Sequence, residues 1–206
     1  MNQPHHLHFT NSVISFGDHE ATPENLAGAI ERYLAGKRTG HTPNIEHQAS
    51  VLAAQDFTTD NGITEFIQAV CWWGGHSGIG GRVLKHNTVE EIRIRLCAAK
   101  TAITKQAPDL QTAIREVRAI HSLGLSFASK HLRMLWPQHC PVLDSRIHEY
   151  LGYALNSTGY CAFAKDCRHV ADVLNQQNIS IPARSGRTTW YVADVEAAVF
   201  RLLNGQ

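Results

Sequence analysis

Apolar residues recur at helical spacing along most of this chain, and capping signals mark where several of these segments begin. Thr22 and Pro23 form an N-cap followed by proline at the first helical position, and Thr88-Val89-Glu90-Glu91 has the spacing of a capping box. Alternating strand patterns are scarce, since Val13–Phe16 and Ile179–Ile181 are too short to build a sheet on. The sequence therefore predicts an all-α fold, with helices over residues 23–35, 45–55, 62–73, 89–105, 110–120, 126–135, 145–151, 160–176 and 190–203.

The balance of apolar and charged residues indicates a chain that buries a core. Of its 206 residues 43% are hydrophobic and 18% are charged, which excludes intrinsic disorder and predicts a single domain over residues 1–206. The 19 Lys and Arg residues against 18 Asp and Glu give a net charge of +1. Binding to nucleic acid through bulk charge is therefore excluded, and any such binding must come from a local patch.

The cysteines and the N-terminal sequence indicate the cellular compartment of the protein and do not indicate a metal site. Five cysteines at irregular spacings, with no CxxC pair, predict free thiols in a reducing environment and neither a zinc nor an iron–sulfur site. His5, His6 and His8 lack further ligands at a suitable spacing, so we expect a mobile terminus instead of a metal site. No signal peptide and no membrane-spanning run is present, and we expect a cytoplasmic protein.

Residues 110–150 depart from this neutral background. Between Arg115 and His148 lie five Arg or Lys residues, four histidines and only two acids, Glu116 and Asp144. A tight turn, residues 121–125, separates two predicted helices, and the N-terminus of a helix presents backbone N–H groups that suit a phosphate. A lone carboxylate in a positive field stays ionised, so Asp144 is placed to stabilise a developing cation or to activate water. The plainer interpretation is that Asp144 only caps the following helix.

The turn and the aspartate of this segment are separated by a defined number of residues. The turn ends at Gly124 with Ala128 four residues later, and Pro141-Val142-Leu143-Asp144 follows before the next predicted helix. This arrangement resembles the helix–hairpin–helix superfamily of DNA glycosylases, and within it most the 8-oxoguanine glycosylase fold. The chain departs from the family pattern where Ser122 replaces the first hairpin glycine, where Leu143 is inserted before the aspartate, and where Arg146 stands at a position that is often histidine.

The resemblance implies two helical lobes with a cleft between them and Asp144 as the catalytic aspartate. Ser126 stands where bifunctional members carry a Schiff-base lysine, which implies a monofunctional enzyme that hydrolyses the glycosidic bond. Lys130 lies one helical turn further along the same face. Its amine could contact the base or a phosphate, neutralise Asp144, or replace the missing nucleophile.

Contacts with DNA are expected from two sets of residues. We expect phosphate contacts from Gly124, Ser126, Arg118, Arg133 and Arg146, although a solvated helix face is an equal interpretation for Arg133. Flipping a base requires a pocket in which it can stack. Aromatic rings beside a glycine-rich loop over residues 74–81, and beside a second basic loop over residues 184–190, predict a pocket formed by Trp72, Trp73, Lys130 and Trp190.

The resulting hypothesis is a DNA glycosylase that flips a damaged or modified base out of double-stranded DNA and hydrolyses its N-glycosidic bond. The substrate would be an 8-oxoguanine-like purine, in base-excision repair, or a modified base of phage DNA, in phage defence. The alternatives are a non-enzymatic helix–hairpin–helix module that grips the DNA backbone and an adaptor on an inactive glycosylase scaffold. We expect no metal, cofactor, membrane association or obligatory protein partner.

Overall fold

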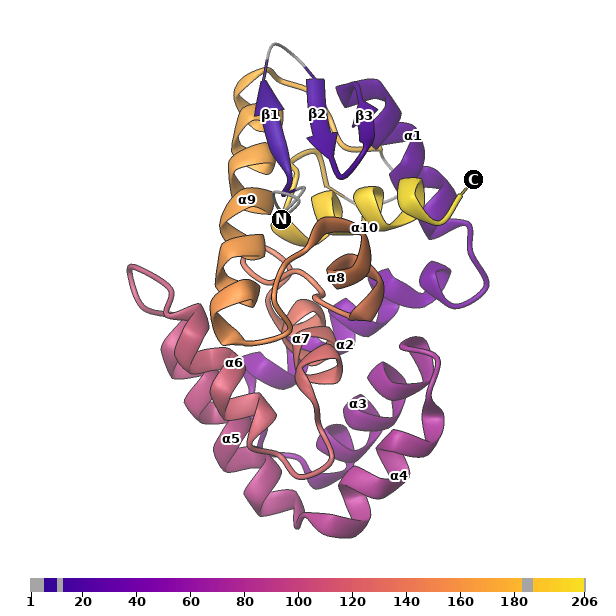
Figure 1. Ribbon diagram of the computed structural model, residues 1–206. Helices are drawn as coiled ribbons and strands as arrows, with labels where there is room; N and C mark the ends of the chain where they lie inside the picture. The colour runs from indigo at the N-terminus through magenta and orange to yellow at the C-terminus, as the bar shows by residue number, and fades with distance from the viewer. Residues whose placement is uncertain (1–5, 11–12, 183–186, 206) are drawn as a thin grey trace.

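The computed structural model describes residues 6–10, 13–182 and 187–205, and within them the chain is mainly helical (Figure 1). Three short strands precede the helices: β1 (His8–Thr10), β2 (Val13–Phe16) and β3 (His19–Ala21). The helices are α1 (Pro23–Leu34), the 3-10 turn η1 (Thr39–His41), α2 (Thr42–Ala54), α3 (Asp60–Trp73), α4 (Ser77–His86), α5 (Val89–Ile103), α6 (Leu110–Arg118), α7 (Leu125–Leu135), α8 (Ser145–Leu151), α9 (Ser157–Gln176) and α10 (Val192–Leu203).

Helices begin at the capping residues that the sequence predicts. The Thr22 side chain accepts the backbone N–H of Asn25, and Thr88 forms a reciprocal capping box with Glu91. Asp109 and Asp144 are the N-caps of α6 and α8. Each of the nine predicted segments contains a helix. In the described part of the chain no helix is long and apolar enough to cross a bilayer.

The expectation that Val13–Phe16 is too short for a sheet is wrong. β2 is the centre of a three-stranded antiparallel sheet, and Gly17, with φ +60°, makes the turn into β3. Ile14 and Phe16 are buried, and the sheet packs against α1 and α9. Long-range packing therefore stabilises strands whose local pattern is weak. His6 also has a defined contact, because its ring stacks on Tyr153.

The expectation of a loop over residues 74–81 is also wrong, because α4 begins inside this glycine-rich segment. Val83 is fully buried in α4, and Gly80 lies close enough to Cys71 on α3 that a methyl group would touch it. Close packing of the two helices thus outweighs the low helix propensity of glycine.

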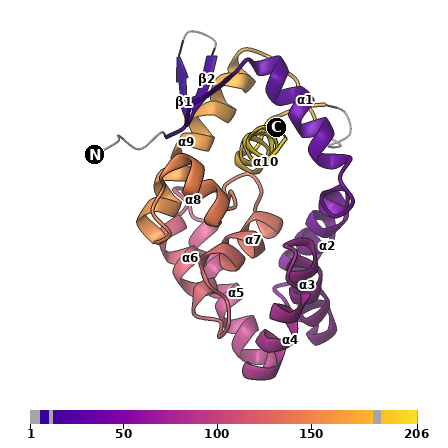
Figure 2. The same ribbon diagram turned by 45° about the vertical axis from the view of Figure 1, so that its right-hand side comes forward.

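The two ends of the chain share one group of elements. α1 packs on α10, α10 packs on α9, and the sheet lies beside them at the top of Figure 1. A second group contains α3, α4, α5 and α6 at the bottom of the same view. α2 and α7 lie between the two groups (Figure 2) and pack on each other. Segments far apart in sequence therefore approach one another around α7.

Candidate active site

The turn between α6 and α7 has the geometry of a tight hairpin. Ser122 adopts φ +74°, a left-handed conformation that favours glycine. Asn87 holds the turn from outside, donating to the carbonyl of His121 at 3.1 Å and accepting its N–H at 2.9 Å. Gly124 is the exposed N-cap of α7, and a side chain there would meet no atom within 4 Å. The first backbone N–H groups of α7 therefore begin at an open surface.

Lys130, Ser126 and Asp144 form one polar cluster. The Lys130 Nζ atom donates to Ser126 Oγ at 2.9 Å and lies 3.3 Å from Asp144 Oδ2. The Lys130 side chain is 8% exposed and that of Asp144 is 17% exposed. Because a helical side chain points toward the N-terminus, Lys130 reaches back one turn to the level of Ser126. The amine and the carboxylate thus meet in a largely dry environment, where charge–charge interactions are stronger than in water.

Two sets of hydrogen bonds fix the position of Asp144. Its Oδ1 atom accepts the backbone N–H of Ile147 at 3.2 Å as the N-cap of α8, which leaves Oδ2 toward Lys130. The preceding residue, Leu143, donates its N–H to Ser129 Oγ at 3.1 Å. The loop that carries the carboxylate is therefore tied to α7, the helix that carries the amine.

Lys130 and Asp144 line a pocket of about 170 Å³, here called the inner pocket. Its walls come from α1, η1, the end of α3, α7, the loop before α8, and α10: Tyr33, Arg38, Thr39, Trp73, Gly74, Lys130, Val142, Asp144, Glu196 and Phe200. Gly74 makes room for the lysine, because a Cβ atom there would lie 2.9 Å from Lys130 Cδ. An engineered cavity of about 150 Å³ holds a benzene molecule, so the inner pocket has room for one aromatic ring.

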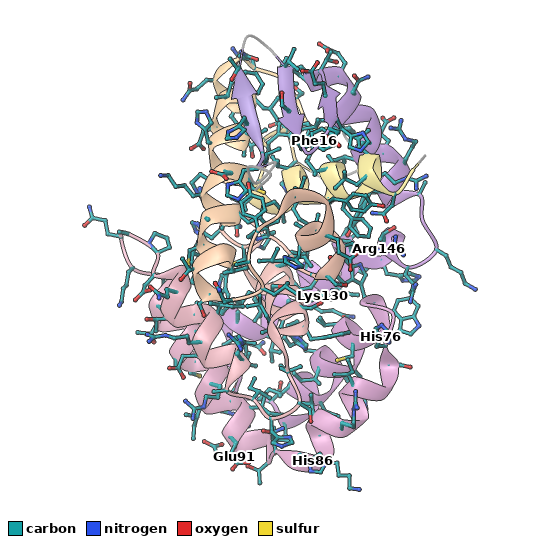
Figure 3. The ribbon with its side chains drawn as sticks, viewed as in Figure 1. Phe16, His76, His86, Glu91, Lys130 and Arg146 are labelled. Carbon is teal, nitrogen blue, oxygen red and sulfur yellow. The ribbon has the colours of Figure 1, made fainter. Side chains whose placement is uncertain are left out.

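The inner pocket continues into a larger groove of about 550 Å³, here called the outer groove. Both are lined by Arg38, Gly74, Lys130, Asp144 and Phe200. The outer groove adds His76, Ser126 and Arg146, which come from three separate parts of the chain. In Figure 3 Arg146 lies above Lys130 and His76 lies below it. Two arginines, Arg38 and Arg146, therefore line this groove together with the Asp144 carboxylate.

Glu196 places a second carboxyl group in the wall of the inner pocket. It is 3% exposed, and its Oε2 atom has no hydrogen-bond partner among the described residues. Burial and the Asp144 carboxylate together raise the pKa of Glu196 to about 8, against the opposing charge of Arg133. The backbone of Val142 is hydrogen-bonded to this carboxyl group. Near neutral pH Glu196 is thus largely a neutral carboxylic acid.

The structure brings several of the predicted site residues together. Lys130, Asp144 and Trp73 line the inner pocket, and Ser126 and Arg146 line the outer groove. Trp73 is fixed there by its indole N–H, which donates to Thr42 Oγ1 at 2.9 Å. Gly124 lies one residue before α7, at the hairpin, and Arg118 is exposed at the end of α6, away from the residues that line the pocket.

Three predicted site residues lie elsewhere. Phosphate contact by Arg133 is wrong, because this side chain is 2% exposed and forms an ion pair with Glu46 of α2. Trp72 is 41% exposed, lies edge-on to His41, and is not among the residues that line the pocket. Trp190 is buried and donates its indole N–H to the carbonyl of Ile179, so it belongs to the core. Residues 184–186 of the second basic loop lie outside the described residues.

Sequence reasoning missed residues that reach the pocket from distant elements. Glu196 and Phe200 lie one turn apart on α10, and Arg38 precedes η1. A signal for Glu196 exists in the sequence, since it is a charged residue among apolar ones in Val192–Leu203. Arg38 lies in a polar loop and carries no comparable signal.

Neither a metal-binding cluster nor a related protein indicates the function of this site. Among the described residues no group of three or more His, Cys, Asp or Glu side chains could hold a metal ion. Comparison of the chain with protein-family models, curated proteins and solved structures finds no match. The chemistry of the site must therefore be argued from its own geometry and from the motif in residues 110–148.

Proposed function

We propose that this protein is a DNA glycosylase that hydrolyses the N-glycosidic bond of a base flipped into the inner pocket. The observation that carries the proposal is the Asp144 carboxylate, held at the wall of a ring-sized pocket by the loop that follows the hairpin. The spacing of Gly124, Ala128 and Asp144 in the sequence supports the same assignment. Two helical lobes, one with both chain ends and one with α3–α6, would then grip the DNA between them.

The charges of the site fit the chemistry of this reaction. As the bond between C1′ and the base nitrogen breaks, its electron pair leaves with the base and positive charge develops on the sugar. The Asp144 carboxylate stabilises that charge in a partly dry site. Water then adds its oxygen to C1′, and its two protons end on the new hydroxyl group and on the departing base. No covalent intermediate with the protein is needed.

Lys130 acts as a positioning residue in this mechanism. Its ammonium group, 3.3 Å from Asp144 Oδ2, holds the carboxylate in place at the wall of the pocket. In this arrangement the amine is held by Ser126 and Asp144 and is not free to attack C1′. Water is therefore the attacking group, and the enzyme is monofunctional.

The hairpin supplies the grip on DNA. α7 begins at the exposed Gly124, and the backbone N–H groups at the N-terminus of a helix suit a phosphate. Arg38 and Arg146 line the outer groove and add positive charge next to the pocket. Backbone contacts of this kind offset part of the few kcal/mol that flipping a base out of the stack costs. The substrate class, an oxidised purine or a modified base of phage DNA, is left to the experiment.

The test is a panel of duplexes, each with one damaged or modified base, incubated with the wild type and with Asp144→Asn and then treated with alkali. Asparagine caps a helix as well as aspartate does, so this variant removes the charge and leaves α8 intact. We expect strand cleavage at one class of base with the wild type and a rate at least about 10²-fold lower with the variant. Equal cleavage by the two proteins would remove Asp144 from the chemistry.

Two further outcomes separate the mechanisms. Borohydride traps a Schiff base, and we expect free base to be released without a protein–DNA adduct. An adduct that disappears in Lys130→Ala would contradict the monofunctional mechanism and make Lys130 the nucleophile. Steeply salt-dependent DNA binding with no product from any duplex would contradict the glycosylase and leave a backbone-binding module.

A further inference from the structure

The inner pocket contains one polar group that the proposed reaction does not use. Glu196 lies on α10, in the wall of the pocket, and is almost fully buried. Its Oε2 atom has no hydrogen-bond partner among the described residues. Leaving a buried polar atom unpaired costs about 1–3 kcal/mol, and the cost is recovered when a ligand supplies the partner.

We propose that Glu196 determines which base is accepted: its carboxyl group turns toward the pocket, and Oε2, which is closed off from solvent in the free protein, donates a hydrogen bond to an acceptor atom on the flipped base. The inference rests on the proposed function and adds a substrate class to it. The accepted base carries a keto oxygen or an unprotonated ring nitrogen on the edge that faces α10. A base with an amino group at that edge would set two donors against each other and is rejected.

The surroundings of Glu196 determine its protonation and therefore the direction of the hydrogen bond. Because Val142 already donates to this carboxyl group, the bound proton is left on the unpartnered oxygen. The pKa of about 8 keeps that proton in place at neutral pH, as burial outweighs the nearby positive charges. The titratable and charged groups that face Glu196 come from α1, α7, the loop before α8, and α9: Tyr33, Lys130, Arg133, Asp144 and Cys167.

Lys130 strengthens the same preference from the other side. An ammonium group has donors and no acceptor, so it also favours a base with acceptor atoms. The aromatic rings of Trp73, Tyr33 and Phe200 supply apolar surface around these polar groups. The pocket thus combines ring contacts with at least two donors, a set that matches an oxo-base.

The experiment compares Glu196→Gln and Glu196→Leu with the wild type on the duplex that the wild type cleaves best, between about pH 6 and pH 9. The glutamine amide still donates a hydrogen bond and does not titrate, whereas leucine cannot donate. We expect the wild-type rate to fall above about pH 8 and the Glu196→Gln rate to lack that fall. Glu196→Leu should be slower on the order of tenfold at pH 7, the equivalent of one hydrogen bond.

A matched control is Glu116→Gln, which makes the same chemical change on the surface of α6, where Glu116 pairs with Arg95. Its pH profile should follow the wild type. Three results would overturn the proposal while the glycosylase activity stands. They are a Glu196→Leu variant as fast as the wild type, identical pH profiles for the wild type and Glu196→Gln, and fastest cleavage of a base that has no acceptor atom on the edge facing α10. Absence of product from every duplex with the wild type would overturn both proposals.

Discussion

At the scale of single residues, the Glu196 carboxyl group gives the fold a dependence on pH. The folded chain keeps its proton up to about pH 8, whereas an unperturbed glutamic acid loses it near 4.5. Between these values the folded chain binds one more proton than the unfolded chain, so the free energy of unfolding falls as the pH rises. We expect Glu196→Gln to raise the melting temperature by at least about 3 °C more at pH 8 than at pH 5, measured by calorimetry. An equal shift at both pH values would contradict the protonated state.

Gly74 provides a second test at this scale, because only a hydrogen atom fits between its backbone and the Lys130 stem. A methyl group would lie 2.9 Å from both Lys130 Cδ and Phe127 Cε1, so Gly74→Ala must displace the lysine. We expect base release to slow between about tenfold and 10²-fold, as for other small misplacements at active sites. Gly78→Ala is the control, since a methyl group there meets no atom within 4 Å. Equal rates for the two variants would show that the position of Lys130 is unimportant.

At the scale of elements, the hairpin and the start of α7 make one prediction about DNA. Gly124 has φ −72° and open space around it, so the fold itself does not require glycine at this position. Gly124→Asp improves the N-cap of α7 but places a negative charge where a phosphate is expected. We expect an affinity for duplex DNA at least about tenfold lower, measured by fluorescence anisotropy at fixed salt. Gly124→Ser, which caps without charge, should bind more tightly than the aspartate variant, and equal affinities would contradict the phosphate site.

The helices could be predicted because their signals are local. Capping residues such as Thr22, Thr88 and Asp144 act within three positions of the helix that they begin. The sheet and α4 could not be predicted, since Ile14 and Gly80 owe their conformations to packing against other elements rather than to local signals. Propensity and alternation therefore underestimate elements that tertiary packing stabilises.

At the scale of the whole molecule, the candidate site is assembled from both groups of elements. Residues 126–146 could be identified from spacing and charge, because the hairpin, the lysine and the aspartate are close in sequence. Glu196 and Arg38 could not, since they reach the pocket from α10 and from the loop before η1, which are far from α7 in sequence. Arg133 shows the converse error: its sequence neighbours suggest a DNA-facing cation, but the fold buries it against Glu46.

The most direct test of the account measures the free base itself, by mass spectrometry, after a single turnover on the duplex that the wild type cleaves best. Asp144→Asn is compared with Asp109→Asn, which changes the N-cap of α6 in the same way, outside the residues that line the pocket. The account predicts free base from the wild type and from Asp109→Asn at similar rates, and almost none from Asp144→Asn. Equal release by both variants would contradict it.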